Sequence, residues 1–138
     1  VYLIPPKKER TIRENSLILT AQGRVNHVNL AIDAFFKSLA DNSGAHAIAV
    51  VLSGAGSDGT EGSRYIKDRG GMVIAQEPGS AAFNSMPVSV IQARLADYVL
   101  KPSEMGEVIR SYVKHLLNPD MDKEEIWEEG EVFKNILL

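Results

Sequence analysis

The sequence contains no cysteine among its 138 residues. This absence excludes disulfide bonds, a cysteine nucleophile and a zinc site with cysteine ligands. Long apolar runs are also missing: no stretch approaches the ~20 residues of a membrane-spanning helix, and the first residues do not resemble a signal peptide. The net charge of −3 supplies no basic field for nucleic acid. We therefore expect a cytoplasmic protein that binds no nucleic acid and does not insert into membranes.

The remaining composition is typical of one globular domain. Hydrophobic residues make up 44% of the chain and charged residues 24%. A chain of 138 residues predicts a single hydrophobic core. The chain begins at Val1 within an expected strand and ends at Leu138 within an expected helix, with no cap or turn residues at either end. We interpret it as a piece of a longer polypeptide.

An apolar run followed by a glycine-rich turn occupies the middle of the chain. Residues 46–53 read HAIAVVLS, which is typical of a parallel strand buried on both faces. Residues 54–59 read GAGSDG, and a helix is expected over 60–69, closed by a Gly-Gly pair. A turn of this kind lies at the carboxyl end of a parallel sheet, where open α/β folds place their sites. Asp58 is the acidic side chain in this turn.

The other segments alternate between strand and helix patterns. Apolar residues predict short strands over 1–4 and 16–20, which form a hairpin at the margin of the sheet, with 7–14 as a solvated connection. Two further buried strands are expected over 72–76 and 98–100. Further helices are expected after a cap at Asn29, around Pro87, and after a cap at Ser103. The alternation predicts an α/β fold, a mainly parallel sheet with helices on both faces.

The glycines of the turn match the dinucleotide-binding pattern G-x-G-x-x-G, between a strand and a helix. Glu77 even supplies a carboxylate at the end of the next strand. However, Asp58 and Glu61 occupy the helix N-terminus on which a pyrophosphate would rest. Two unit charges ~5 Å apart cost about 3 kcal/mol at an effective dielectric of ~20. A Rossmann-like nucleotide-binding module therefore stays an alternative with an electrostatic objection.

A second interpretation makes Asp58 the orienting acid of a serine hydrolase. A carboxylate in this position can accept the Nδ1–H of a histidine and stabilise the imidazolium that forms when a serine attacks. The glycines leave backbone N–H groups free to face an oxyanion. The simpler alternative is that Asp58 only caps the helix that follows it, which is common for Asp at a helix start.

Several stretches of the chain resemble, in order and spacing, the catalytic domain of the chemotaxis receptor methylesterase, the CheB type. The glycine turn is one part of this resemblance, and the others are spread along residues 1–117. They are Val1–Pro5, Ile32–Ala40, Val51–Gly59, Ile74–Glu77, Phe83–Pro87 and Ala96–Leu100. The resemblance implies a protein-glutamate methylesterase, a serine hydrolase that removes methyl esters from chemoreceptor glutamates and also deamidates glutamines there.

The resemblance also implies roles for particular residues. Asp58 would be the acid of a Ser-His-Asp triad, and the backbone N–H of Ala55, where the family usually has Met, would lie near the oxyanion hole. Gly54, Gly56 and Gly59 would shape the same loop. The turn that contains Phe83, Met86 and Pro87 would form a wall of the pocket. The family needs no metal and no organic cofactor.

Two motifs of this family are absent from the sequence. The family's nucleophile lies in a G-x-S-x-G-G turn after the first strand, and its histidine follows the second strand; neither motif occurs here. The histidines of the chain are His27, His46 and His115, and none matches the catalytic one. We therefore expect the first strands of the domain, with the serine and the histidine, to precede Val1. The isolated chain is expected to be inactive, weakly stable and prone to self-association through an exposed sheet edge.

The end of the chain suggests a second domain. Residues 118–123 are expected to form a linker, and residues 129–138 are similar to the first helix of the receptor methyltransferase that follows the esterase in fused proteins. An ordinary amphipathic helix is the alternative. We thus assign 1–117 to the end of a methylesterase domain and 118–138 to the approach to a methyltransferase. Methylated chemoreceptors are the expected partners, and a non-catalytic signalling scaffold is a further alternative.

Overall fold

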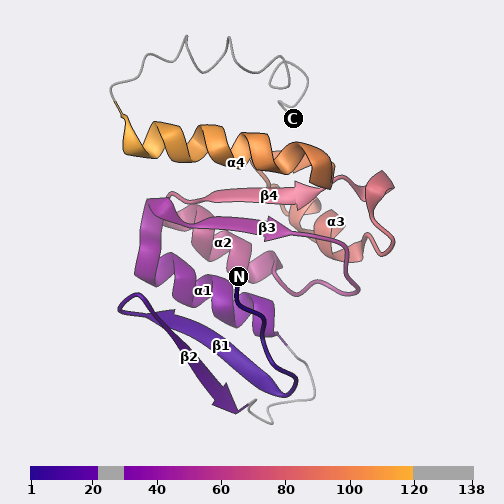
Figure 1. Cartoon of the computed structure of the whole chain (residues 1–138). Coiled ribbons are helices and arrows are strands. Elements are labelled where there is room, and N and C mark those ends of the chain that lie inside the picture. Colours follow the sequence, from indigo (N-terminus) through magenta and orange to yellow (C-terminus); the bar gives the residue numbers. More distant parts are fainter. Residues whose placement is uncertain (22–29, 120–138) are drawn as a thin grey trace.

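A computed structural model describes residues 1–21 and 30–119 of the chain (Figure 1). Within these ranges the chain forms nine regular helices and strands and two short 3₁₀ turns, η1 (Gly44–His46) and η2 (Pro78–Ser80). In chain order they are β1 (Lys8–Arg13), β2 (Ser16–Ala21), α1 (Ala31–Ser43), β3 (Ile48–Val51), α2 (Thr60–Asp68), β4 (Met72–Gln76), α3 (Ser85–Gln92), β5 (Tyr98–Leu100) and α4 (Pro102–Leu117).

The strands β3, β4 and β5 form a parallel sheet in that order. Ile48 pairs with Met72 across the first ladder, and Ile74 pairs with Tyr98 across the second. Each crossover contains a helix, α2 in the first and α3 in the second, as parallel connections require. All five residues of β4 are buried because it is the central strand. The predicted parallel α/β fold is confirmed.

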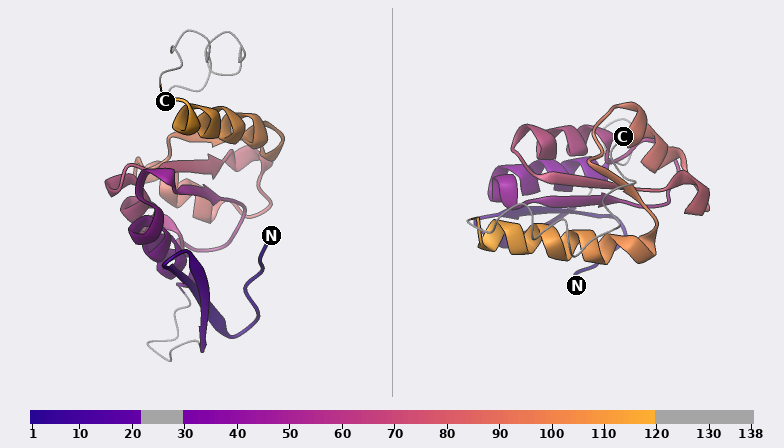
Figure 2. Two further views of the ribbon diagram at one scale, coloured as in Figure 1. Left: turned by 60° about the vertical axis from the view of Figure 1, so that its left-hand side comes forward. Right: turned by 90° about the horizontal axis from the view of Figure 1, so that it is seen from above.

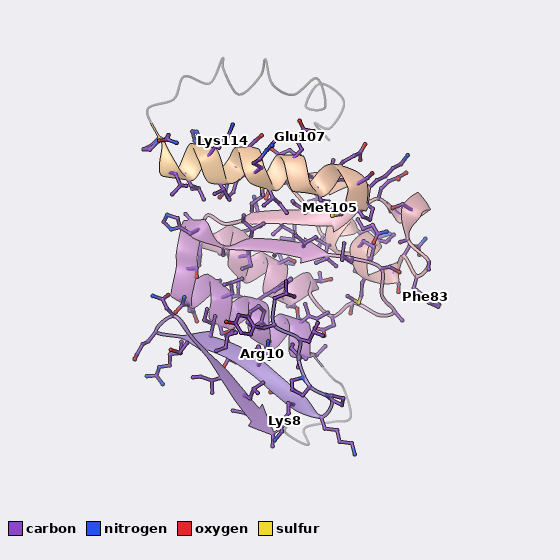
Figure 3. The ribbon with its side chains drawn as sticks, in the orientation of Figure 1. Lys8, Arg10, Phe83, Met105, Glu107 and Lys114 are labelled. Atoms are coloured by element: carbon purple, nitrogen blue, oxygen red, sulfur yellow. The ribbon has the colours of Figure 1, made fainter. Side chains whose placement is uncertain are left out.

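Helices cover both faces of this sheet, with α4 on one side and α1 and α2 on the other (Figures 1 and 2). Alternate residues of β4 enter the two cores, since successive side chains of a strand point to opposite faces. Val73 and Ala75 join the core that includes α1, α2 and α3, whereas Met72 and Ile74 join the core beneath α4. Figure 3 shows Met105 of α4 on the side that faces the sheet.

The N-terminal hairpin differs from the prediction. Its strands are β1 and β2, so the expected strand over 1–4 and the solvated connection over 7–14 are both wrong. The ladder runs from Lys8 opposite Ala21 to Arg13 opposite Ser16. Glu14 and Asn15 close it with φ values of 50° and 60°, as a two-residue hairpin turn requires. Residues 1–4 pair with no strand of the described chain, which explains their exposure.

The hairpin is a separate two-stranded sheet that packs against α1, not a margin of the parallel sheet. The backbone N–H of Ile12 donates to Ser38 Oγ at 3.0 Å, and that of Asn15 donates to Asn42 Oδ1 at 3.0 Å. These bonds run to one face of α1. The opposite face of the helix is therefore available to pack on α2.

Three smaller predictions also differ in the structure. β3 is shorter than 46–53, and because it is an edge of the described sheet its Ile48 and Val50 are only half-buried. Ser103 does not cap α4, which begins at Pro102; instead the N–H of Lys101 donates to Glu104 Oε2 at 2.9 Å. The helices α2 and α3 and the strands β4 and β5 lie where the sequence predicts them.

Some predictions lie outside the described residues: the cap at Asn29, His27, and residues 120–138, which hold most of the expected linker and the final helix. The expected self-association through a sheet edge stays a prediction. No helix in the described ranges has the length and apolar character needed to cross a membrane.

Candidate functional site

The loop that contains Asp58 follows the carboxyl end of β3, where the sequence analysis expects a site. Two of its glycines have the left-handed backbone that side chains disfavour, with φ of 88° at Gly56 and 98° at Gly59. A Cβ on Gly59 would also lie 3.1 Å from Ile32 Cγ2. The glycine turn therefore reverses the chain directly against the start of α1.

The Asp58 carboxylate binds the start of α1 through both of its oxygens. Oδ2 accepts the backbone N–H of Ile32 at 3.0 Å, and Oδ1 accepts that of Asp33 at 2.9 Å. These first-turn N–H groups have no partner within their own helix, and the helix dipole favours a negative charge there. Asp58 thus caps α1, and the expectation that it could cap the following helix is wrong.

The N-terminus of α2 is bound by a different acid, Asp33. Its Oδ1 accepts the backbone N–H groups of Gly59 at 2.9 Å and Gly62 at 2.6 Å. Burial raises the pKa of Asp33 above its ordinary value of 3.8; the Gly62 hydrogen bond lowers it, and the neighbouring Asp58 carboxylate raises it. The sequence analysis gave Asp33 no role, although an acid in a first helical turn is a recognisable signal for such a contact.

The capping bonds leave the Asp58 carboxylate able to accept further hydrogen bonds. An ionised carboxylate offers about four lone-pair positions, of which two are used by the α1 amides. The residue is only half-buried. A further donor such as an imidazole N–H can therefore bind a carboxylate that is already fixed by two backbone groups.

The other arm of the loop is bonded to the segment before α3. The N–H of Gly54 donates to the Phe83 carbonyl at 2.9 Å, and the N–H of Phe83 donates to Ser53 Oγ at 2.9 Å. The N–H of Gly56 donates to Ser85 Oγ at 2.9 Å. This pairing attaches the loop to the start of α3.

The three residues expected in a pocket wall have three different environments. Met86 packs on the loop, because a Cβ added to Gly54 would collide with Met86 Sδ. Pro87 is buried within α3. Phe83 is held through its backbone, but the residue is 67% exposed and its side chain projects from the molecule (Figure 3).

A buried polar side chain that the sequence analysis assigned to no site links this loop to η2. Gln76, 5% exposed at the end of β4, accepts the Ser53 N–H through Oε1 at 2.9 Å. Its Nε2 donates to the carbonyl and Oγ of Ser80 at 3.0 and 3.1 Å. A glutamine at the end of an otherwise apolar strand is the signal that could have identified it.

The backbone N–H of Ala55 has no acceptor among residues 1–21 and 30–119, and the residue is exposed. A backbone N–H that no protein group accepts is the kind of donor that an oxyanion site needs.

The structure brings none of the described histidines to Asp58. His46 is exposed in η1, before the amino end of β3, while Asp58 follows the carboxyl end. His115 lies in α4, across the sheet from α1. Across the described ranges, no group of three or more acidic or histidine side chains is arranged to hold a metal ion.

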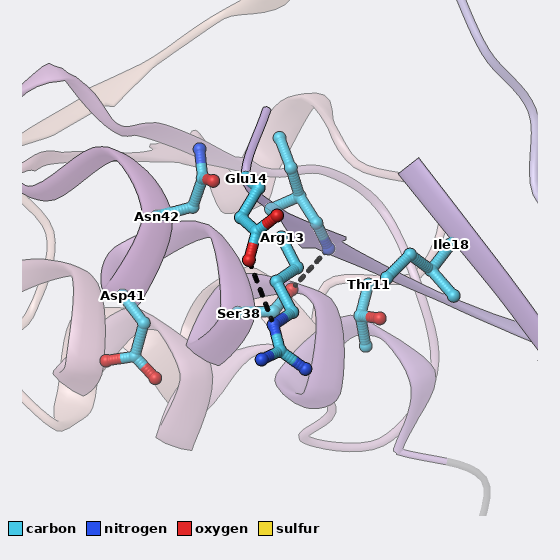
Figure 4. A pocket seen from close by; sticks show the side chains of 8 residues that line it. Thr11, Arg13, Glu14, Ile18, Ser38, Asp41 and Asn42 are labelled. Carbon is cyan, nitrogen blue, oxygen red and sulfur yellow. Dashed lines mark hydrogen bonds and ion pairs between the residues drawn. The ribbon is translucent and has the colours of Figure 1, made fainter. Parts of the chain in front are cut away.

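A groove of about 640 Å³ lies elsewhere, between the hairpin and the last turns of α1 (Figure 4). It contains none of the expected site residues. Its lining side chains are Thr11, Ile12, Arg13, Glu14, Ile18, Ser38, Asp41 and Asn42.

Known proteins are similar to this chain in sequence and in fold. A family model described as CheB methylesterase matches residues 1–109. The chain belongs to the CheB methylesterase family. The crystal structure of the Thermotoga maritima CheB methylesterase catalytic domain is similar, with a TM-score of 0.66 and 30% sequence identity over 76% of this chain. The predicted family resemblance is confirmed.

Two relatives show how much of such proteins the chain represents. A putative protein-glutamate methylesterase/protein-glutamine glutaminase from Leptospira interrogans is 35% identical over 78% of the chain, which spans 56% of that relative. An uncharacterised 104.1 kDa protein from Rhodobacter capsulatus is 42% identical over 82% of the chain, which spans 12% of it. The chain likewise covers 58% of the Thermotoga domain. It thus corresponds to a part of its relatives.

Membership of this family and the geometry of α2 both argue against the nucleotide-binding alternative. The Gly59 and Gly62 N–H groups, which would bind a pyrophosphate, already bind the Asp33 carboxylate. Asp58 and Glu61 add negative charge at the same helix end.

Proposed function

We propose that the protein containing this chain is a serine hydrolase that removes methyl esters from chemoreceptor glutamates and deamidates glutamines. Asp58 supplies the acid of its triad, and the serine and histidine come from polypeptide outside these 138 residues. The observation that carries the proposal is the Asp58 carboxylate in the loop after β3, fixed by the N–H groups of Ile32 and Asp33 with lone pairs left over.

In this mechanism Asp58 accepts the histidine Nδ1–H and selects the tautomer whose Nε2 takes the serine proton. The serine oxygen attacks the ester carbonyl, and the Ala55 N–H stabilises the oxyanion. The imidazolium then protonates the departing methoxide, so methanol leaves and an acyl-enzyme remains. Water hydrolyses this acyl-enzyme by the same steps to give glutamate. For glutamine, ammonia takes the place of methanol.

The proposal extends to the surroundings of this domain. Residues 1–117 form the end of the catalytic domain, and residues 118–138 lead to a methyltransferase in the same cytoplasmic polypeptide. The size of the 104.1 kDa relative, of which the chain spans only 12%, supports a protein with further domains. The substrates are methylated chemoreceptors, and neither a metal nor an organic cofactor takes part.

Methanol release from methylated receptor by the full-length protein tests this assignment. We expect Asp58→Asn to lower kcat by about 10⁴-fold, because the amide favours the wrong histidine tautomer. Circular dichroism reports whether the variant stays folded, and Asp68→Asn, at an exposed acid of α2, is the matched control. A folded Asp58 variant with unchanged turnover would contradict the triad role. A wild-type protein that releases no methanol would favour the scaffold alternative.

A further inference from the structure

We propose that Asp33 is a positioning residue for Asp58: it acts on turnover by fixing the turn that carries the triad acid, and it touches no substrate. This inference rests on the proposed function.

The two acids are connected in both directions. The Asp33 backbone N–H donates to Asp58 Oδ1 at 2.9 Å, and the Asp33 carboxylate binds the N–H of Gly59, which follows Asp58 in the chain. Asp33 therefore contacts the catalytic turn both at its side chain and at its backbone. A shift of Asp33 would move both contacts together.

Close packing makes this connection rigid. A Cβ on Gly62 would lie 2.6 Å from Phe36 Cβ and 2.9 Å from Asp33 Cα, so α1 and α2 touch here without intervening side chains. The Gly62 N–H to Asp33 Oδ1 bond, at 2.6 Å, lies in the same contact. The helices cannot slide without breaking these bonds, and the position of Asp58 is thereby set relative to the sheet.

The consequence for catalysis follows from the tolerance of such geometry. A misplacement of about 1 Å in a catalytic constellation can cost about 10²-fold in rate. Without the Asp33 carboxylate, the N–H groups of Gly59 and Gly62 lose their acceptor and the turn loses one of its two attachments to α1. Substrate binding is expected to change little, because Asp33 acts through Asp58 and touches no substrate.

A double-mutant cycle in the full-length protein separates positioning from a merely structural role. We expect Asp33→Ala to lower kcat by about 10- to 100-fold while KM stays within about twofold. Asp33→Asn keeps Oδ1 as an acceptor, and its kcat should stay within about threefold of wild type. In an Asp58→Ala background, Asp33→Ala should have no further effect on kcat, because its action passes through Asp58. Asp41→Ala, at an exposed acid near the other end of α1, is the control.

The possible results distinguish failure of the Asp33 positioning role from failure of the proposed function. Unchanged kcat in a folded Asp33→Ala variant, or equal losses in both backgrounds, would overturn the positioning role while leaving the triad assignment intact. Unchanged kcat in Asp58→Ala would instead overturn the proposed function. If Asp33→Ala does not fold, Asp33→Glu replaces it, since it keeps the charge but lengthens the side chain by one methylene. It should lower kcat, but only when Asp58 is present.

Discussion

Asp58, in the loop before α2, and Asp33, in the first turn of α1, bind the N-termini of different helices: the Asp58 carboxylate accepts N–H groups at the start of α1, and the Asp33 carboxylate accepts N–H groups at the start of α2. Asp58 accepts one N–H on Oδ1 and one on Oδ2, whereas Asp33 accepts the N–H groups of Gly59 and Gly62 on the same atom, Oδ1. Backbone groups that a helix cannot satisfy internally thus join α1 to α2 at the edge of the candidate site.

This asymmetry predicts different responses to the same substitution. Asp58→Asn places an NH₂ group against a backbone N–H and should destabilise the protein by about 1–2 kcal/mol. Asp33→Asn can keep its oxygen toward both amides and should change the stability by less than about 0.5 kcal/mol. Urea unfolding of the two variants beside wild type measures the difference. Equal losses would show that both Asp33 oxygens are needed.

The raised pKa of Asp33 predicts a pH-dependent contribution to stability. The folded state holds this proton more tightly than the unfolded state, whose pKa is close to 3.8. The contribution therefore favours folding fully below pH 3.8 and is lost as the pH rises through the folded pKa. The free energy of unfolding of wild type minus that of Asp33→Asn should fall between pH 3 and neutrality, by at most about 1.4 kcal/mol per pH unit. A difference that grows with pH would contradict the raised pKa.

The close contact of α1 with α2 predicts that Gly62 tolerates no side chain. Gly62→Ala would place its Cβ 2.6 Å from Phe36 Cβ, and we expect a loss of about 1–3 kcal/mol from overpacking. Gly106→Ala is the matched control, since α4 is open there with nothing within 4 Å. It should stabilise the protein by about 0.5–1 kcal/mol through helix propensity. Thermal unfolding of both variants measures this; a neutral Gly62→Ala would mean that the helices can separate.

The hydrogen bond between Gln76 and Ser53 predicts that Gln76 stabilises both the core and the loop after β3. Gln76→Leu leaves the N–H of Ser53 without its acceptor and should cost about 1–3 kcal/mol. Gln92→Leu, at an exposed glutamine at the end of α3, is the control and should cost little. Hydrogen exchange at the Ser53 amide is the local measurement and should accelerate in the Gln76 variant alone. Unchanged exchange would contradict the bond seen in the structure.

The alternation of strands and helices from α1 to α4 was predictable because it depends on local patterns. Apolar runs over 72–76 and 98–100 match β4 and β5, and the glycine pair after α2 ends that helix through the left-handed Gly70, with φ of 82°. The hairpin was harder to predict, since Lys8–Arg13 carries mostly charged side chains and its closing turn includes Glu14, an unusual residue at positive φ.

By itself the sequence determined the alternation of a parallel α/β fold and the placement of Asp58 in a glycine turn, because these follow from the spacing of residue types along the chain. Its resemblance to the CheB type indicated the family. Only the tertiary structure decided what Asp58 binds. Its partners at Ile32 and Asp33 lie 26 and 25 residues away, and no local pattern states which helix end will meet which carboxylate. The packing of the helices decides this pairing. It brings α2, at Gly62, against α1, and each carboxylate then accepts the unpaired amides at the start of a neighbouring helix.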